Sequence, residues 1–142
     1  MRGGAHHIDL TVRELKVSHA FYEAFLNYLG FVVAKVSDEI IEYELPSALN
    51  AKIGDYQLSI GLVPARENAT PHDRYSPGLH HLALRAESRA DVDDFYAHLQ
   101  KIGAPILDAP AEYPQYSPGY YAVFFSDPDG LKLEYVFKPL SP

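Results

Sequence analysis

An internal repeat limits the possible folds of this chain more than any other feature. The segment HHIDLTV, which contains His7, has a counterpart in HHLALRA, which contains His81. A helical pattern carrying the pair Phe-Tyr follows in both copies, and Phe21 follows His7 at the same spacing as Phe95 follows His81. Self-similarity at a fixed spacing is the signature of a duplicated structural unit. The chain is therefore predicted to contain two similar modules.

Each copy predicts the element order β-α-β-β-β. Alternating apolar and polar residues predict the strands, and an apolar helical face that ends at a glycine predicts the helix. In the first copy we expect a strand over 6–12, a helix over 18–29 and strands near 31–36, 40–45 and 56–63. In the second copy we expect a strand over 80–86, a helix over about 90–102 and strands near 105–108, 120–126 and 131–137.

The predicted fold is α+β, with a single domain over residues 1–142. Module one covers about 5–64, a linker rich in Pro, Asn, Asp and Arg covers about 65–78, and module two covers about 79–138. A four-stranded sheet with one helix leaves one face uncovered, so the two curved mixed sheets are expected to enclose a shared metal-binding cavity. The barrel could close within one chain or across a dimer, and the open sheet edges favour a homodimer.

Three residues are predicted to bind a metal ion. Because residues i and i+2 of a strand share a face, Asp9 is expected beside His7 on the cavity side, and Arg85 on the side of His81. In the last strand, alternation with apolar residues turns Glu134 inward, where an unpaired carboxylate is costly. Two imidazoles and one carboxylate are a common ligand set for Zn²⁺, Ni²⁺, Mn²⁺, Co²⁺ or Fe²⁺. We therefore predict one divalent metal ion at His7, His81 and Glu134.

At these residues the sequence resembles the vicinal-oxygen-chelate superfamily, which includes glyoxalase I, methylmalonyl-CoA epimerase, fosfomycin-resistance enzymes, extradiol dioxygenases and bleomycin-binding proteins. The similar segments are HHIDLTV, SHAFYEAFLNYLGF, GLHHLALRA and FFSDPDGLKLEYV, within about residues 5–138. The resemblance implies paired βαβββ modules with metal ligands at His7, His81 and Glu134. Many members add a Glu or Gln ligand from the last strand of the first module. Gln57 is the candidate here, and a solvent-facing glutamine is the alternative.

Further residues are candidates for substrate binding or catalysis. Ser59 shares a face with Gln57 and would make that wall small and polar. Asp9 stands where relatives often carry a neutral side chain; it could orient a ligand, act as a base or pair with Arg85, and the ion pair is preferred because it leaves neither charge unpaired. Tyr120 or Tyr121 could hydrogen-bond a bound oxygen species, with aromatic packing as the alternative.

The resemblance implies a metal-dependent lyase or isomerase of glyoxalase I or epimerase type. Such an enzyme chelates adjacent oxygens of a small substrate and stabilises an enediolate-like intermediate. The general base would be Glu134, Asp9 or a metal-bound water. The first alternative is an Fe(II) extradiol-type dioxygenase, since two histidines and one carboxylate form its facial triad. The second is a non-enzymatic small-molecule (drug) binding protein.

Composition excludes several other classes. The net charge is −7 and no Lys/Arg cluster occurs, which argues against a nucleic-acid partner. No apolar run is long enough to predict a membrane span. The chain has no Cys, so thiolate metal sites and disulfides are impossible, and this fits a cytoplasmic location. The neighbours of the predicted ligands, His6 and His80, are assigned to packing or an interface because adjacent strand residues face opposite sides.

Overall fold

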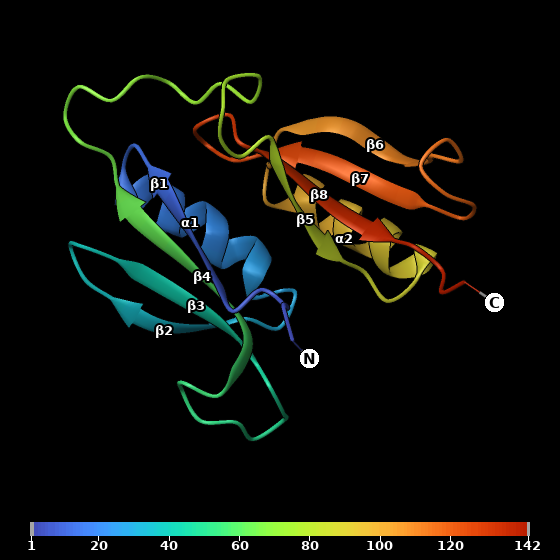
Figure 1. Ribbon diagram of the computed structural model, residues 1–142, viewed down its shortest axis with the longest axis horizontal. Helices are drawn as coiled ribbons and strands as arrows, with labels where there is room; N and C mark the ends of the chain where they lie inside the picture. The colour runs from blue at the N-terminus through green and yellow to red at the C-terminus, as the bar shows by residue number, and fades with distance from the viewer. Residues whose placement is uncertain (1, 142) are drawn as a thin grey trace. The chain divides into compact units, whose positions relative to one another are not determined.

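The computed structural model describes residues 2–141, which divide into two compact units with the boundary after residue 70. Each unit contains one four-stranded mixed sheet and one helix that covers one face of that sheet (Figure 1). The strand orders are β1-β4-β3-β2 and β5-β8-β7-β6, so each sheet is open with two edge strands. The α+β class and the two βαβββ modules are confirmed. The shared cavity stays a prediction.

Unit one has the predicted order of elements, with one shift at its helix. Its elements are β1 (His7–Val12), α1 (Leu15–Leu26), β2 (Val32–Val36), β3 (Ile41–Pro46) and β4 (Tyr56–Pro64). β1 pairs with β4 in parallel, and β3 pairs with β4 and β2 in antiparallel fashion. The helix begins and ends about one turn before the predicted 18–29. Gly30 takes a φ of 98° in the turn that leads to β2.

Unit two repeats this plan. Its elements are β5 (His81–Arg85), α2 (Arg89–Lys101), β6 (Ile106–Glu112), β7 (Tyr121–Ser126) and β8 (Lys132–Phe137). β5 pairs with β8 in parallel, and β7 pairs with β8 and β6 in antiparallel fashion. β6 extends past the predicted 105–108, because its pairing with β7 continues through two register shifts. A register shift allows Pro110 within β6, because proline has no backbone N–H to donate to a regularly paired strand.

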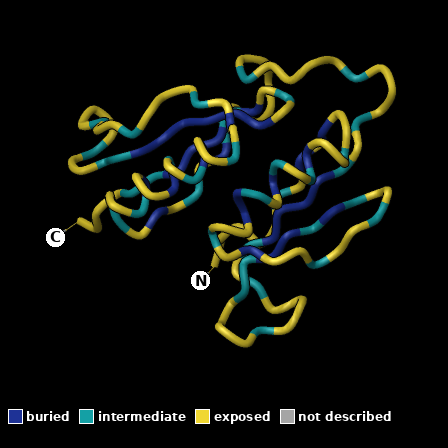
Figure 2. The backbone as a smooth tube through the Cα atoms, turned by 180° about the vertical axis from the view of Figure 1, so that it is seen from behind, coloured by how far each residue is buried: buried dark blue, intermediate teal, exposed yellow. Residues whose placement is uncertain are grey.

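The core of unit one lies between α1 and its sheet. Tyr22, Phe25 and Leu26 of the helix are buried, as are Ile60 and Leu62 of β4. Figure 2 shows the buried segments of each unit in dark blue along strands and helix. This apolar layer fixes which face of the sheet stays uncovered.

The core of unit two likewise lies between its helix and its sheet. Val92, Phe95 and Leu99 of α2 are buried. The ring of Phe95 lies 4.5 Å from that of Tyr135 and 5.6 Å from that of Phe125, centroid to centroid. These contacts hold β7 and β8 against the helix, so the residues that alternate with them lie on the other face.

The uncovered faces carry the polar residues of the repeat. In β1 the exposed residues are His7, Asp9 and Thr11, and in β5 they include Ala83 and Arg85. The alternation predicted from the sequence therefore holds in both units. Among residues 2–141, no helix has the length and apolar character needed to cross a membrane.

Candidate functional site

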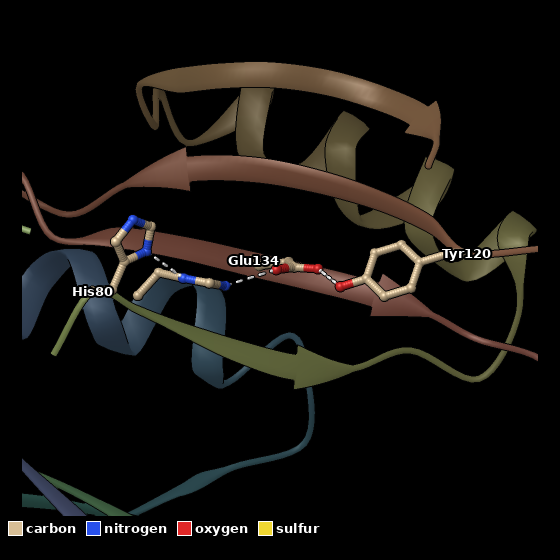
Figure 3. Close-up of polar contacts among 4 residues, drawn as sticks. His80, Tyr120 and Glu134 are labelled. Atoms are coloured by element: carbon tan, nitrogen blue, oxygen red, sulfur yellow. Dashed lines mark hydrogen bonds and ion pairs between the residues drawn. The ribbon is translucent and has the colours of Figure 1, made fainter. Parts of the chain in front are cut away.

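Glu134 is the most enclosed carboxylate among the predicted site residues. It lies in the middle of β8 and is 3% exposed. Its Oε1 lies 3.1 Å from Nε2 of His81, and its Oε2 accepts a hydrogen bond from the hydroxyl of Tyr120. Figure 3 shows this chain of contacts from His80 through Glu134 to Tyr120. A buried carboxylate needs such partners, since burial without them is costly.

The imidazole of His81 has a second contact besides Glu134. Its Nδ1 lies 2.7 Å from Nδ1 of His80. With Nδ1 engaged in this way, Nε2 is the ring nitrogen left on the side of Glu134. Unit one repeats the arrangement, because Nδ1 of His6 lies 2.9 Å from Nδ1 of His7. Each predicted ligand histidine therefore contacts the histidine before it. His6 and His80 also pack against the rings of Tyr56 and Tyr75, as expected for a packing role.

Tyr120 lies directly before β7 and serves as the donor to Glu134. Its burial, the hydrogen bond to Glu134 and the negative charge of that carboxylate together raise the pKa of Tyr120 well above its usual range. The phenol is thus held in its protonated form. At neutral pH Tyr120 is therefore a hydrogen-bond donor to Glu134.

An aromatic cluster lies next to this carboxylate. The rings of Tyr113 and Tyr116 stack with centroids 5.4 Å apart, and Tyr113 also meets Phe124 edge-on at 5.4 Å. Phe124 is paired in register with Glu134, so the two side chains share the uncovered face. The ammonium of Lys132 lies 4.3 Å from the Phe124 ring centre. This face of unit two combines one anion, one cation and an aromatic wall.

Two other predicted residues of unit two lie on opposite faces. Arg85 is exposed on the uncovered face, two residues along β5 from Ala83, which pairs with Glu134. Tyr121 instead faces α2: its hydroxyl donates to Oδ1 of Asp93 at 2.6 Å. This hydrogen bond is the main reason that the pKa of Tyr121 is raised. The structure therefore brings Arg85, but not Tyr121, to the face of Glu134.

In unit one, the predicted residues lie along β1 and β4. His7 pairs in register with Ser59, and Asp9 pairs with Gly61. Ser59 is buried and also pairs with Glu44 of β3. These side chains share the uncovered face of the sheet.

Gln57 lies on the same face but nearer the start of β4. It is exposed, and its side-chain amide donates to the backbone carbonyl of Pro46 at 3.1 Å. By the register of the repeat, the counterpart of Glu134 is Gly61, because Glu134 pairs with Ala83 as Gly61 pairs with Asp9. A metal-ligand role for Gln57 stays a prediction.

Sequence reasoning did not single out Glu44 or assign a polar role to the first histidine of each pair. Glu44 is a buried carboxylate whose Oε2 accepts a hydrogen bond of 2.8 Å from the backbone N–H of Gly54. The repeated dipeptide His-His was the available signal for His6 and His80. Within residues 2–141, no three His, Asp or Glu side chains are grouped as a preformed metal site. The joint site of His7, His81 and Glu134 stays a prediction.

Comparisons with known proteins agree on one family. The sequence model of the Glyoxalase/Bleomycin resistance protein/Dioxygenase superfamily matches residues 4–135. The chain is 34% identical over 134 residues to the uncharacterized protein YqjT of Bacillus subtilis (strain 168), which covers 92% of this chain and 96% of that protein. This match extends over nearly the whole of both chains.

Solved structures share the fold. A candidate glyoxalase from Bacillus halodurans is 28% identical with a TM-score of 0.76, over 96% of this chain and 97% of that one. Lactoylglutathione lyase from Agrobacterium tumefaciens is 17% identical with a TM-score of 0.65, over 95% and 93%. The second likeness concerns the fold alone. On the extent of the family match and the duplicated βαβββ fold, the chain belongs to the Glyoxalase/Bleomycin resistance protein/Dioxygenase superfamily.

Proposed function

We propose that the protein is a metal-dependent lyase or isomerase of glyoxalase or epimerase type. Its substrate would be a small molecule that carries two adjacent oxygen atoms. The observation that carries this proposal is the buried carboxylate of Glu134, held between the imidazole of His81 and the hydroxyl of Tyr120. The superfamily includes many enzymes and commonly uses a divalent metal.

The donor atoms of unit two fit a divalent metal. Two nitrogen or oxygen ligands that would each lie about 2.1 Å from one ion would be roughly 3.0–3.4 Å apart. Nε2 of His81 and Oε1 of Glu134 are separated by 3.1 Å. In the proposal these two atoms and His7 hold the ion, with Gln57 as a further candidate ligand. The ion would supply Lewis acidity toward the two substrate oxygens and so stabilise the negative charge that develops there.

Three side chains of unit two have distinct tasks in this proposal. Tyr120 donates to Oε2 of Glu134 and thereby fixes the carboxylate, with Oε1 on the side of His81. His80 holds Nδ1 of His81, as outer partners of metal-binding histidines commonly do. We assign proton transfer to Glu134, because it is the carboxylate that shares this face with the proposed ligand His81.

Substrate binding would fall to the remaining residues of the uncovered faces. Arg85 offers a positive charge on the face of Glu134 for an anionic group of the substrate. Tyr120 and the aromatic rings around it offer an apolar wall. Ser59 supplies a small polar surface in unit one.

Deuterium incorporation tests this function. The metal-reconstituted protein would be incubated in D₂O with small compounds that carry a hydroxyl next to a carbonyl, and exchange at the carbon beside the carbonyl followed by NMR. We expect exchange in the native protein and its loss in Glu134→Gln. Glu112→Gln, which alters an exposed carboxylate paired with Arg89, is the matched control and retains exchange. A native protein that binds no Zn²⁺ or Ni²⁺ at stoichiometric metal contradicts the proposal.

A second candidate is an Fe(II) extradiol-type dioxygenase. The aromatic cluster of Tyr113, Tyr116 and Phe124 beside Glu134 favours it, because such a wall suits a flat aromatic diol. Oxygen consumption with catechols after anaerobic loading with Fe²⁺ separates the two candidates. Consumption that depends on Glu134 supports the dioxygenase, and its absence leaves the lyase or isomerase.

The proposal also includes a homodimer. The sheets end in the edge strands β1 and β2 in unit one and β5 and β6 in unit two, and exposed edges favour pairing with a further chain. Light scattering on the purified protein measures the mass directly. Twice the mass of the chain supports the homodimer, and the mass of one chain contradicts it.

A further inference from the structure

The loop over 113–120, between β6 and β7, carries Tyr113, Tyr116 and Tyr120. The backbone N–H of Tyr113 donates to the carbonyl of Tyr120 at 2.9 Å, and this hydrogen bond closes the loop at its base. Inside the loop, the N–H of Tyr116 donates to the carbonyl of Tyr113 at 3.0 Å. Two prolines in the loop restrict its backbone further. The loop is therefore a closed, hydrogen-bonded turn that fixes the positions of its aromatic rings.

The rings of Tyr113 and Tyr116 form a stack with an open outer side. Their planes differ by 12° and their centroids lie 5.4 Å apart. The Tyr120 ring is steeply inclined to both, with its centroid 5.3 Å from that of Tyr116 and 6.2 Å from that of Tyr113. The three centroids thus form a triangle rather than a row, so Tyr120 lies beside the stack and not on the outer face of Tyr116. Tyr116 is 62% exposed, which leaves that face accessible.

The stack lies beside the carboxylate of the proposed site. Tyr120, whose ring borders the stack, donates its hydroxyl to Oε2 of Glu134. Tyr113 meets Phe124 edge-on, and Phe124 pairs in register with Glu134. All of these residues belong to unit two. A flat group stacked on Tyr116 would therefore be separated from the hydrogen bond between Tyr120 and Glu134 by a single ring.

We propose that Tyr116 is a specificity-determining residue whose exposed face binds an aromatic ring of the substrate. This inference rests on the proposed function, because it names the substrate class of the same site: a compound with oxygen on two adjacent carbons and an aryl group on one of them. A flat ring adds a third member to the stack, and offset-stacked rings attract one another beyond the burial of their area. A saturated ring of similar size is not flat and gains only the apolar contact. The fixed loop favours binding, because its rings need no ordering.

Three hydroxymethyl ketones, with a phenyl, a cyclohexyl or a methyl group on the carbonyl, test this inference. Their binding to the purified protein would be followed by NMR titration, which requires no turnover. We expect the phenyl compound to bind about three- to tenfold more tightly than the cyclohexyl compound. Tyr116→Leu should weaken binding of the phenyl compound by about the same factor and leave the cyclohexyl compound nearly unchanged, whereas Tyr116→Phe keeps the preference. Tyr28→Leu, which removes another exposed tyrosine ring in unit one, is the control and should keep the native affinities.

The outcomes separate this inference from the proposed function. No binding of the phenyl compound, equal affinity for the phenyl and cyclohexyl compounds, or a phenyl preference that survives in Tyr116→Leu overturns the role of Tyr116. Deuterium exchange with the methyl compound then still supports the proposed function. A phenyl preference that is lost in Tyr116→Leu supports aryl binding at Tyr116 even when the protein catalyses no exchange, and only the proposed function then fails. Should circular dichroism show that Tyr116→Leu does not fold, the comparison of the phenyl and cyclohexyl compounds in the native protein decides the question.

Discussion

At the scale of single residues, the site of unit two is a chain of hydrogen-bonding groups in which each member fixes the next. His80 contacts His81, His81 contacts Glu134, and Tyr120 closes the chain at the other carboxylate oxygen. When this chain is complete, burial of the carboxylate lowers the folding stability only a little. When the chain is interrupted, the buried carboxylate lacks a partner and the loss of folding stability is large.

The hydroxyl of Tyr120 should contribute to stability. Tyr120→Phe removes the donor to Oε2 and leaves the buried Glu134 with one partner fewer. We expect the free energy of unfolding to fall by about 1–3 kcal/mol, measured by urea denaturation at neutral pH. Tyr96→Phe, which removes a hydroxyl that contacts Gln100 on the exposed side of α2, is the matched control and should change stability far less. Equal effects of the two substitutions would contradict the role of Tyr120.

The same residue predicts a pH dependence. The pKa of Tyr120 is raised in the folded protein, first by burial and then by Glu134. Above about pH 10, the ordinary pKa of tyrosine, the unfolded chain loses this proton while the folded chain keeps it. Stability is therefore complete below pH 10 and declines as the pH rises further. Urea denaturation from pH 8 to pH 11 should show a shallower decline in Tyr120→Phe than in the native protein; parallel declines would refute this.

The contact of His80 with Nδ1 of His81 can be distinguished from the packing of the His80 ring by two substitutions. His80→Phe keeps a ring but has no nitrogen to contact Nδ1 of His81, whereas His80→Asn places an amide atom near the same point. We expect His80→Phe to weaken Zn²⁺ binding about 10–100-fold and His80→Asn to restore much of it. Competition titration measures both. Native affinity in His80→Phe would show that the contact has no role in metal binding.

At the scale of elements, the two equivalent helices begin in different ways. Ser88 caps α2: its hydroxyl accepts from the backbone N–H of Asp91 at 3.0 Å, and Asp91 in turn accepts from the N–H of Glu87 at 2.9 Å. α1 begins after Glu14, whose side chain makes no such cap. The apolar periodicity predicts a start of α1 near Ser18, but this serine is buried inside the helix. Without a capping residue, the true start had no sequence signal.

This difference gives a paired prediction on stability. Ser88→Ala should lower the free energy of unfolding by about 1 kcal/mol, because the N–H of Asp91 loses its acceptor. Glu14→Ser should raise it by a smaller amount, because it adds an acceptor at the start of α1. Thermal and urea unfolding check both. Unchanged stability in Ser88→Ala would contradict the capping role.

At the scale of the whole molecule, the repeat makes the fold predictable from the sequence. The site is predictable only in part, because the sequence does not show the register in which distant strands pair. Period-two alternation placed Asp9 and Glu134 on the correct faces, because that pattern is local. It could not show which residue of β4 lies beside Asp9, since pairing between strands distant in sequence is set by packing. The candidate chosen from β4 was therefore Gln57, whereas the strand register makes Gly61 the counterpart of Glu134.

The central proposal is that His7, His81 and Glu134 bind one divalent metal ion, and calorimetric titration of the apo protein with Zn²⁺ tests it most directly. The native protein should bind one ion per chain, and both His7→Ala and His81→Ala should weaken that binding at least tenfold. His72→Ala, in the exposed segment of the chain that follows β4 and precedes β5, is the control and should bind normally. Native affinity in His7→Ala, together with loss of binding in His81→Ala, would confine the metal to unit two and contradict the claim.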